Sequence, residues 1–154
     1  MDDQLQALFA SFKNEQDREF IKEAIRIQRE AEQEGIPLRL LGSLAFRLQC
    51  PKNATHFEAQ DRRITENEFA ASTRHRDRLR DRLTIDNRTL SLADLLLEKM
   101  QIVEISRKDF KDTAILLLEH GIGEDDRAIN MEYIANILSN DWGFFYTFST
   151  NLCK

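Results

Sequence analysis

The sequence is poor in residues that break or cross-link a chain. Among 154 residues it has five glycines, two prolines, two cysteines and one tryptophan. Few glycines and prolines mean few tight turns, which disfavours an all-β sandwich and predicts long helices. Cys50 and Cys153 are too few for a disulfide framework, and no C-x-x-C pair is present for zinc. No apolar run approaches the roughly 20 residues of a membrane span, and the first residues do not resemble a signal peptide. We therefore expect a reduced, soluble, cytoplasmic protein with no membrane partner.

What the chain does contain is a globular but highly charged mixture. Hydrophobic residues make up 42% and charged residues 32%, which fits one domain, alone or with a small appendage. The net charge of −5 argues against a chain that coats nucleic acid along its whole length. The charge is uneven, because residues 62–88 carry eight basic and five acidic side chains and the remainder carries 14 and 22. A local basic region of +3 therefore lies within an acidic chain.

This basic region contains arginines at every second position over residues 74–82. A period of two spreads charge around a helix instead of forming one stripe, so a solvated helix is one interpretation. The alternative is a contact with RNA or phosphate through residues 74–82.

The N-terminal part has a mixed helix and strand pattern. Apolar spacing predicts a short helix over residues 5–12 and a longer one from Asn14 to Gly35. Residues 38–41 predict a short buried strand, residues 43–50 a helix that stops at Pro51, and residues 64–69 a second strand. Residues 83–86 fit a short strand or a turn. The longer helix is expected to bury a stripe made of Phe20, Ile21, Ala24, Ile25, Gln28 and Ala31.

The C-terminal part, from about residue 89, has the pattern of helices alone. Ser91 with Asp94, and Ser106 with Asp109, have the spacing of capping boxes at two helix starts. Asn130 is expected to cap a third helix, and an aromatic segment opens at Asp141. The first of these helices carries apolar positions as far as Val103. The second is expected to bury Phe110, Thr113, Ala114 and Leu117.

Two motifs in the N-terminal part have the residue types of a nucleotide site. Gly42-Ser43 follows the predicted strand and opens a helix, where backbone amides and the helix dipole favour a phosphate. The alternative is an ordinary turn with a helix cap. Glu66 and Glu68 are spaced so that both carboxylates leave the same face of a strand, as ligands of Mg²⁺ would. The alternative for this pair is a solvated acidic turn.

Three charged residues stand out in the C-terminal part. Lys99 follows a leucine-rich stretch, and it either extends to solvent or reaches a phosphate as a point charge. Asp109 and Asp112 lie one turn apart on the next predicted helix. Asp109 already has a structural role in the predicted capping box, whereas the sequence assigns no structural role to Asp112.

Taken together, these segments resemble the nucleotidyltransferase superfamily, which has a polymerase-beta-like palm, and within it the bacterial branch that includes abortive-infection toxins. The resemblance rests on the strand and turn at residues 40–45, on Glu98-Lys99 in one helix, and on Lys108-Asp109 with Asp112 in the next. It implies an α+β fold, with a shortened nucleotidyltransferase-like palm over residues 1–88 and a C-terminal helical bundle over residues 89–154.

The resemblance also implies an activity: transfer of a nucleoside monophosphate from an NTP to an acceptor hydroxyl, with Mg²⁺ as cofactor. Glu66 and Glu68 would then be metal ligands and catalytic residues together with Asp112. Gly42, Ser43, Lys99 and Asp109 would bind the nucleotide.

Two departures from the family pattern bear on that activity. Glutamates replace the family's Asp-x-Asp pair, and each extra methylene moves the carboxylate outward by about 1.5 Å, which octahedral Mg²⁺ tolerates poorly. Only 22 residues separate Glu68 from Ser91, so Asp86 is the sole candidate for the family's third carboxylate. The expectation is therefore an impaired or inactive enzyme. The alternative is a pseudoenzyme that binds nucleotide or a protein partner, and a missing centre would also favour self-association.

Overall fold

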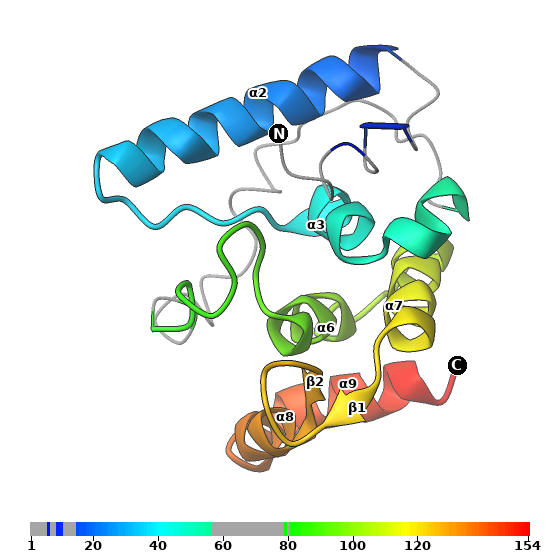
Figure 1. The fold of residues 1–154 in the computed structure, drawn as a ribbon. Coiled ribbons are helices and arrows are strands. Elements are labelled where there is room, and N and C mark those ends of the chain that lie inside the picture. Colours follow the sequence, from blue (N-terminus) through cyan, green and yellow to red (C-terminus); the bar gives the residue numbers. More distant parts are fainter. Residues whose placement is uncertain (1–5, 7–8, 11–14, 57–78, 80) are drawn as a thin grey trace. The chain divides into compact units, whose positions relative to one another are not determined.

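The computed structural model describes residues 6, 9–10, 15–56, 79 and 81–154, and these divide between two compact units, Met1–Leu90 and Ser91–Lys154. Helices predominate, and one small sheet of two parallel strands accompanies them (Figure 1). The fold is therefore α+β in the general sense. The predicted strand over residues 64–69 and most of the arginine run lie outside the described residues.

The longest helix of the first unit is α2, Glu15–Gln33. It ends in a Schellman motif, in which Ile36 N–H donates to Ala31 O at 2.8 Å and Gly35 N–H donates to Glu32 O at 3.0 Å. Gly35 has a φ of +72°, a left-handed conformation that glycine adopts without strain. The predicted stop at Gly35 is confirmed.

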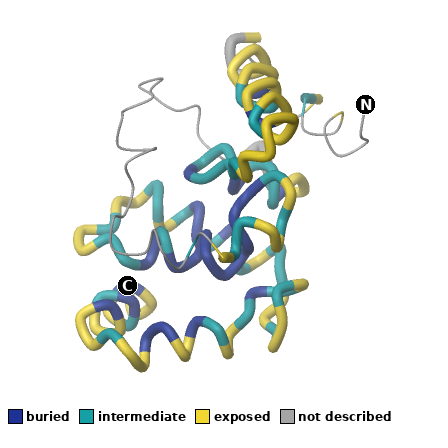
Figure 2. The backbone as a smooth tube through the Cα atoms, turned by 90° about the vertical axis from the view of Figure 1, so that its left-hand side faces the viewer, coloured by how far each residue is buried: buried dark blue, intermediate teal, exposed yellow. Residues whose placement is uncertain are grey.

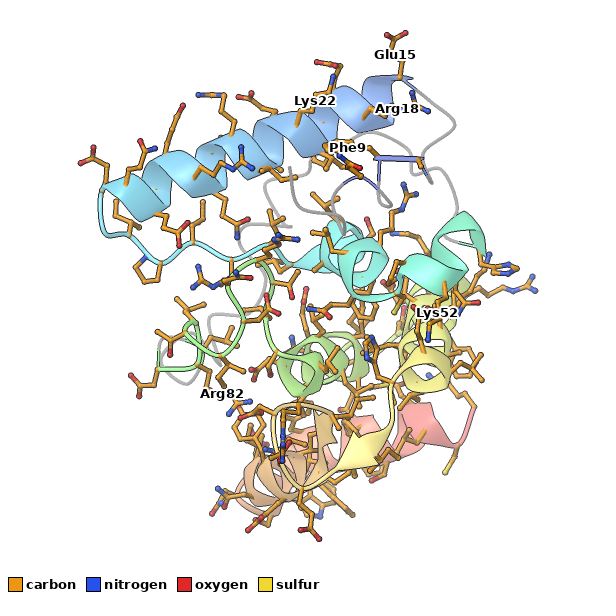
Figure 3. All side chains as sticks on the ribbon, in the orientation of Figure 1. Phe9, Glu15, Arg18, Lys22, Lys52 and Arg82 are labelled. Carbon is orange, nitrogen blue, oxygen red and sulfur yellow. The ribbon has the colours of Figure 1, made fainter. Side chains whose placement is uncertain are left out.

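One face of α2 is buried and the rest is exposed, as the yellow colour along most of the helix shows in Figure 2. Ile21 is 1% exposed and packs with Phe9, Ile25 and two leucines of the next helix. Figure 3 shows Phe9 on this inner side of α2, with Lys22 on the opposite side. Phe20 is 42% exposed, so its expected place in the buried stripe is wrong.

The chain then runs extended into α3, Gly42–Gln49, and a 3-10 helix, Pro51–His56. The predicted helix ending at Pro51 is confirmed. The predicted strand over residues 38–41 is reduced to a single parallel bridge between Leu40 and Thr89. Residues 81–88 form turns and bends, so the turn was the correct alternative for residues 83–86.

Helix α6, Leu92–Met100, is the centre of the second unit. It contacts α7, β2, α8 and α9, and all of its residues except Glu98 are buried. A helix that is apolar around most of its circumference is normally found in such a central position. The expected continuation of this stripe to Val103 is wrong, because α6 ends at Met100 and Val103 is 76% exposed.

In helix α7, Arg107–Glu119, Thr113 is buried as expected, but the other residues of the expected face are not. Leu116 is fully buried, whereas Leu117 is half-buried and Phe110 is 41% exposed. The buried face also includes Asp112, to which the sequence pattern assigned no structural role.

Strands β1 (Ile122–Gly123) and β2 (Ile129–Asn130) pair in parallel, with Ile122 opposite Ile129. Helix α8, Met131–Ser139, follows directly, and α9, Trp142–Leu152, completes the unit. The expectation of helices alone after residue 89 is thus wrong, because two-residue strands are too short to produce an alternating pattern.

Candidate functional site

The turn into α3 has a backbone that only glycine adopts easily. Gly42 is buried, has a φ of +67° and is the first residue of α3. A Cβ in this left-handed region would cost about 1–2 kcal/mol. The N-cap residue Leu41 is extended and makes no side-chain cap hydrogen bond. Among the five helices whose N-caps are described, this is the one start without a side-chain cap.

An uncapped helix start leaves backbone N–H groups for another acceptor, and the helix dipole places partial positive charge at the same point. Ser43 is half-buried beside Gly42. The arrangement is chemically suited to an anion such as a phosphate.

Backbone hydrogen bonds fix the segment that leads to this turn. Leu40 N–H donates to Arg88 O at 2.8 Å, and Leu90 N–H donates to Leu40 O at 3.2 Å. The side-chain amide of Gln28, which is 7% exposed, donates to Leu38 O at 3.0 Å and to Arg88 O at 2.6 Å. The Gln28 side chain on α2 therefore links the extended segment at Leu38 to residues 87–88, which lie near the end of the first unit in sequence.

Asp86, the sole candidate for a third carboxylate, lies in the same turn region. Its Oδ1 accepts hydrogen bonds from the N–H groups of Arg88 at 2.7 Å and Thr89 at 2.8 Å. Gln49 donates to Asp86 Oδ2 at 3.3 Å and to Thr89 Oγ1 at 2.6 Å. These contacts give Asp86 a role in shaping the turn that presents Thr89 to Leu40.

The second unit brings together three of the predicted residues. Lys99 Nζ lies 2.7 Å from Asp109 Oδ1 and 3.9 Å from Asp112 Oδ2. The side chains of Lys99, Asp109 and Asp112 are 9%, 20% and 3% exposed. One lysine thus faces two carboxylates in a largely buried position, and we call these three residues the lysine cluster.

Asp109 also completes the predicted capping box of α7. Ser106 Oγ donates to Asp109 Oδ2 at 2.6 Å, and Asp109 N–H donates to Ser106 Oγ at 3.1 Å. Burial by itself would raise the pKa of Asp109. The hydrogen bonds from Lys99 and Ser106 and the charges of Lys99 and Lys108 outweigh burial, so the pKa lies below its usual value. Asp109 is therefore ionised at neutral pH.

Two further polar contacts support α6, and sequence reasoning missed both. Asn151 is 1% exposed, and its amide donates to Met100 O at 3.1 Å and Ile102 O at 2.8 Å, which caps the end of the helix that carries Lys99. At the other end, Tyr133 O–H donates to Asp94 Oδ1 at 2.8 Å. A signal for Asn151 was present, because it follows the buried Phe144 and Phe148 at helical spacing.

The predicted site residues therefore fall into three groups. Gly42 and Ser43 belong to the first unit, and Lys99, Asp109 and Asp112 to the second. Glu66 and Glu68 lie outside the described residues. Within the described part of the chain, no group of three or more His, Cys, Asp or Glu residues could hold a metal ion.

Comparison with known proteins found no match: no family model, no curated protein and no solved structure matches this chain. None of the helices that the structure describes has the length and apolar character to cross a membrane.

Proposed function

We propose that the chain is a nucleotidyltransferase-like protein that binds the phosphates of a nucleoside triphosphate at the turn into α3, with impaired or absent transfer of the nucleotide. The observation that carries this proposal is the uncapped start of α3 at Gly42, whose φ is +67°. A glycine there removes the Cβ from the approach to the first helical amides, as phosphate-binding turns require.

Glu66 and Glu68 are the proposed Mg²⁺ ligands, and their longer side chains are the reason to expect weak catalysis. In the second unit, Lys99 already lies between two carboxylates of the chain, so the proposal depends on the α3 turn more than on the lysine cluster. A contact of residues 74–82 with RNA stays a prediction.

The test compares two glycines that share a left-handed backbone. Gly42 has a φ of +67° and opens α3, whereas Gly35 has a φ of +72°, ends α2 and has no atom within 4 Å of an added Cβ. Both Gly42→Ala and Gly35→Ala place a Cβ in the left-handed region, so both should lower the melting temperature in the absence of ligand, and Gly42→Ala should lower it more because Gly42 is buried. Only Gly42→Ala should also lose nucleotide binding.

Binding is measured as the rise in melting temperature with each Mg²⁺-nucleoside triphosphate, because a ligand that binds only the folded state stabilises it. A rise in the wild type and in Gly35→Ala, but not in Gly42→Ala, supports the proposal. No rise in the wild type at millimolar nucleotide, or an equal rise in both variants, contradicts it.

Catalysis is tested separately by following pyrophosphate release. The double variant Glu66→Ala with Glu68→Ala should abolish any release that the wild type shows. Release that survives in the double variant would remove these glutamates from the site while leaving the binding test unaffected.

A further inference from the structure

Helix α9 presents a solvent face without any charged residue. None of its eleven residues, Trp142 to Leu152, is acidic or basic. Trp142, Phe145 and Tyr146 are 75%, 50% and 59% exposed, and the rings of Trp142 and Tyr146 stack at 5.5 Å. Single exposed apolar residues are ordinary, but three neighbouring aromatic side chains on one helix face mark a contact surface.

The exposed face has the spacing of a helix-pairing seam. Trp142, Tyr146, Ser149 and Cys153 follow one another at intervals of four, three and four residues, the spacing with which paired helices meet. Ser149 is half-buried, and the other three are exposed. Cys153 has φ −88° and ψ −1°, so the helical conformation extends to it. The first half of the seam is large and aromatic, and the second half is small.

This distribution is complementary to itself under a two-fold axis. In an antiparallel pair centred between Tyr146 and Ser149, each Tyr146 opposes a Ser149 and each Trp142 opposes a Cys153. Large side chains then meet small ones throughout, as close packing of facing helices requires. A parallel pair would instead place the aromatic residues against one another and the small residues against one another.

The charges next to the helix fit the same arrangement. Asp141 precedes Trp142, and Lys154 follows Cys153, so the antiparallel pair brings each Asp141 close to a Lys154 of the other copy. Within one copy, Asp141 Oδ1 caps α9 by accepting a hydrogen bond from Phe144 N–H, and Lys154 Nζ donates to Asn151 Oδ1. Neither contact neutralises the charge of Asp141 or Lys154, so the two side chains can still attract each other between copies. The antiparallel helix dipoles add to this attraction. An RNA strand is a poorer fit, because a stacking surface for RNA needs basic side chains along it.

From this complementarity we propose that α9 is a self-association surface, on which a second copy of this chain binds through an antiparallel, two-fold α9–α9 contact. At about 200 Å² per aromatic side chain, the exposed parts of the three aromatic residues amount to roughly 350–400 Å² per copy. A stable interface buries about 800 Å² per partner, so the contact is a weak and reversible one.

Disulfide trapping distinguishes the pairing geometry. In the antiparallel pair the two Cys153 residues lie about 16 Å apart along the axis, too far to join, whereas a thiol at position 142 faces Cys153 of the other copy. Trp142→Cys should therefore give a covalent dimer under mild oxidation while the wild type stays uncrosslinked. The matched control is Leu118→Cys on α7, whose native side chain is 82% exposed, and it should give no covalent dimer.

Sedimentation equilibrium gives an independent measurement without any thiol chemistry. The wild type should show a dimer that grows with protein concentration. Tyr146→Glu should weaken association at least tenfold by placing two carboxylates in the seam, and Leu118→Glu should leave it unchanged. Circular dichroism checks that each variant keeps its helices. A wild type that is monomeric at millimolar concentration, equal effects of the two Glu variants, or a wild-type Cys153 disulfide dimer would overturn the proposal.

Discussion

Replacing Lys99 by methionine removes the cation of the lysine cluster while keeping an unbranched side chain of similar length. Lys99 Nζ lies 2.7 Å from Asp109 and 3.9 Å from Asp112, and the three side chains are at most 20% exposed. Removing one partner of a buried pair leaves an uncompensated buried charge, which typically costs about 3–5 kcal/mol. Because Asp109 keeps some contact with solvent, we expect a loss at the lower end, about 3 kcal/mol of unfolding free energy at pH 7.

The same substitution should change how stability depends on pH. In the wild type the pKa of Asp109 is lowered, so its contribution is present above the unfolded pKa of about 3.9 and is lost as the pH falls through the folded value. Without Lys99, its hydrogen bond and its charge no longer lower the pKa of Asp109 while burial still raises it, so we expect the pKa to rise. The variant then regains stability as the pH falls through that raised value, so its deficit against the wild type should narrow from pH 7 to pH 4.

Urea denaturation at pH 7 and pH 4, without nucleotide, measures both effects. The matched control is Lys22→Met, because Lys22 lies 2.6 Å from Glu19 but the two side chains are 58% and 65% exposed. That surface pair should contribute under about 1 kcal/mol. A loss for Lys99→Met no larger than the control, or a deficit that widens at pH 4, would refute the reasoning about the lysine cluster.

Two further predictions concern the packing of the second unit. Leu116→Ala should lower the unfolding free energy by about 2–5 kcal/mol because Leu116 is fully buried. Leu117→Ala should lower it by clearly less, because Leu117 is half-buried. The reverse order in urea denaturation would contradict the packing of α7. Asn151→Ala should lower the unfolding free energy by about 1–3 kcal/mol, because the carbonyls of Met100 and Ile102 lose their side-chain donor, and an unchanged melting temperature would show that this cap is dispensable.

Local signals in the sequence were enough to place most helix ends. The caps at Ser91, Ser106 and Asn130 are confirmed, because each side chain accepts a hydrogen bond from a backbone N–H three residues later. Gly35 ends α2 for an equally local reason. These features depend on residues within one or two turns of each other, which a pattern in the sequence records directly.

The contacts that position the candidate site were less predictable, because their partners are distant in sequence. Gln28 reaches carbonyls 10 and 60 residues away, and Asn151 reaches one 51 residues away. Lys99 and Asp109 were predicted separately as functional residues, but their ion pair was not predicted. The buried face predicted for α7 was correct at Thr113 but did not include Asp112. Asp112 lies near Lys99, and hydrophobic spacing in the sequence does not reveal such a polar contact.

The tie between the early and late segments of the first unit has a consequence for synthesis on the ribosome. Gln28 and Leu40 bind backbone groups of residues 88–90, so neither can complete its contacts until those residues have left the exit tunnel. Until then the buried side of α2 can pack against Phe9 and the leucines of α3, but the Gln28 amide lacks the Arg88 carbonyl that it binds in the finished unit. Nascent chains released before residue 90 should therefore be the form that chaperones and proteases recognise.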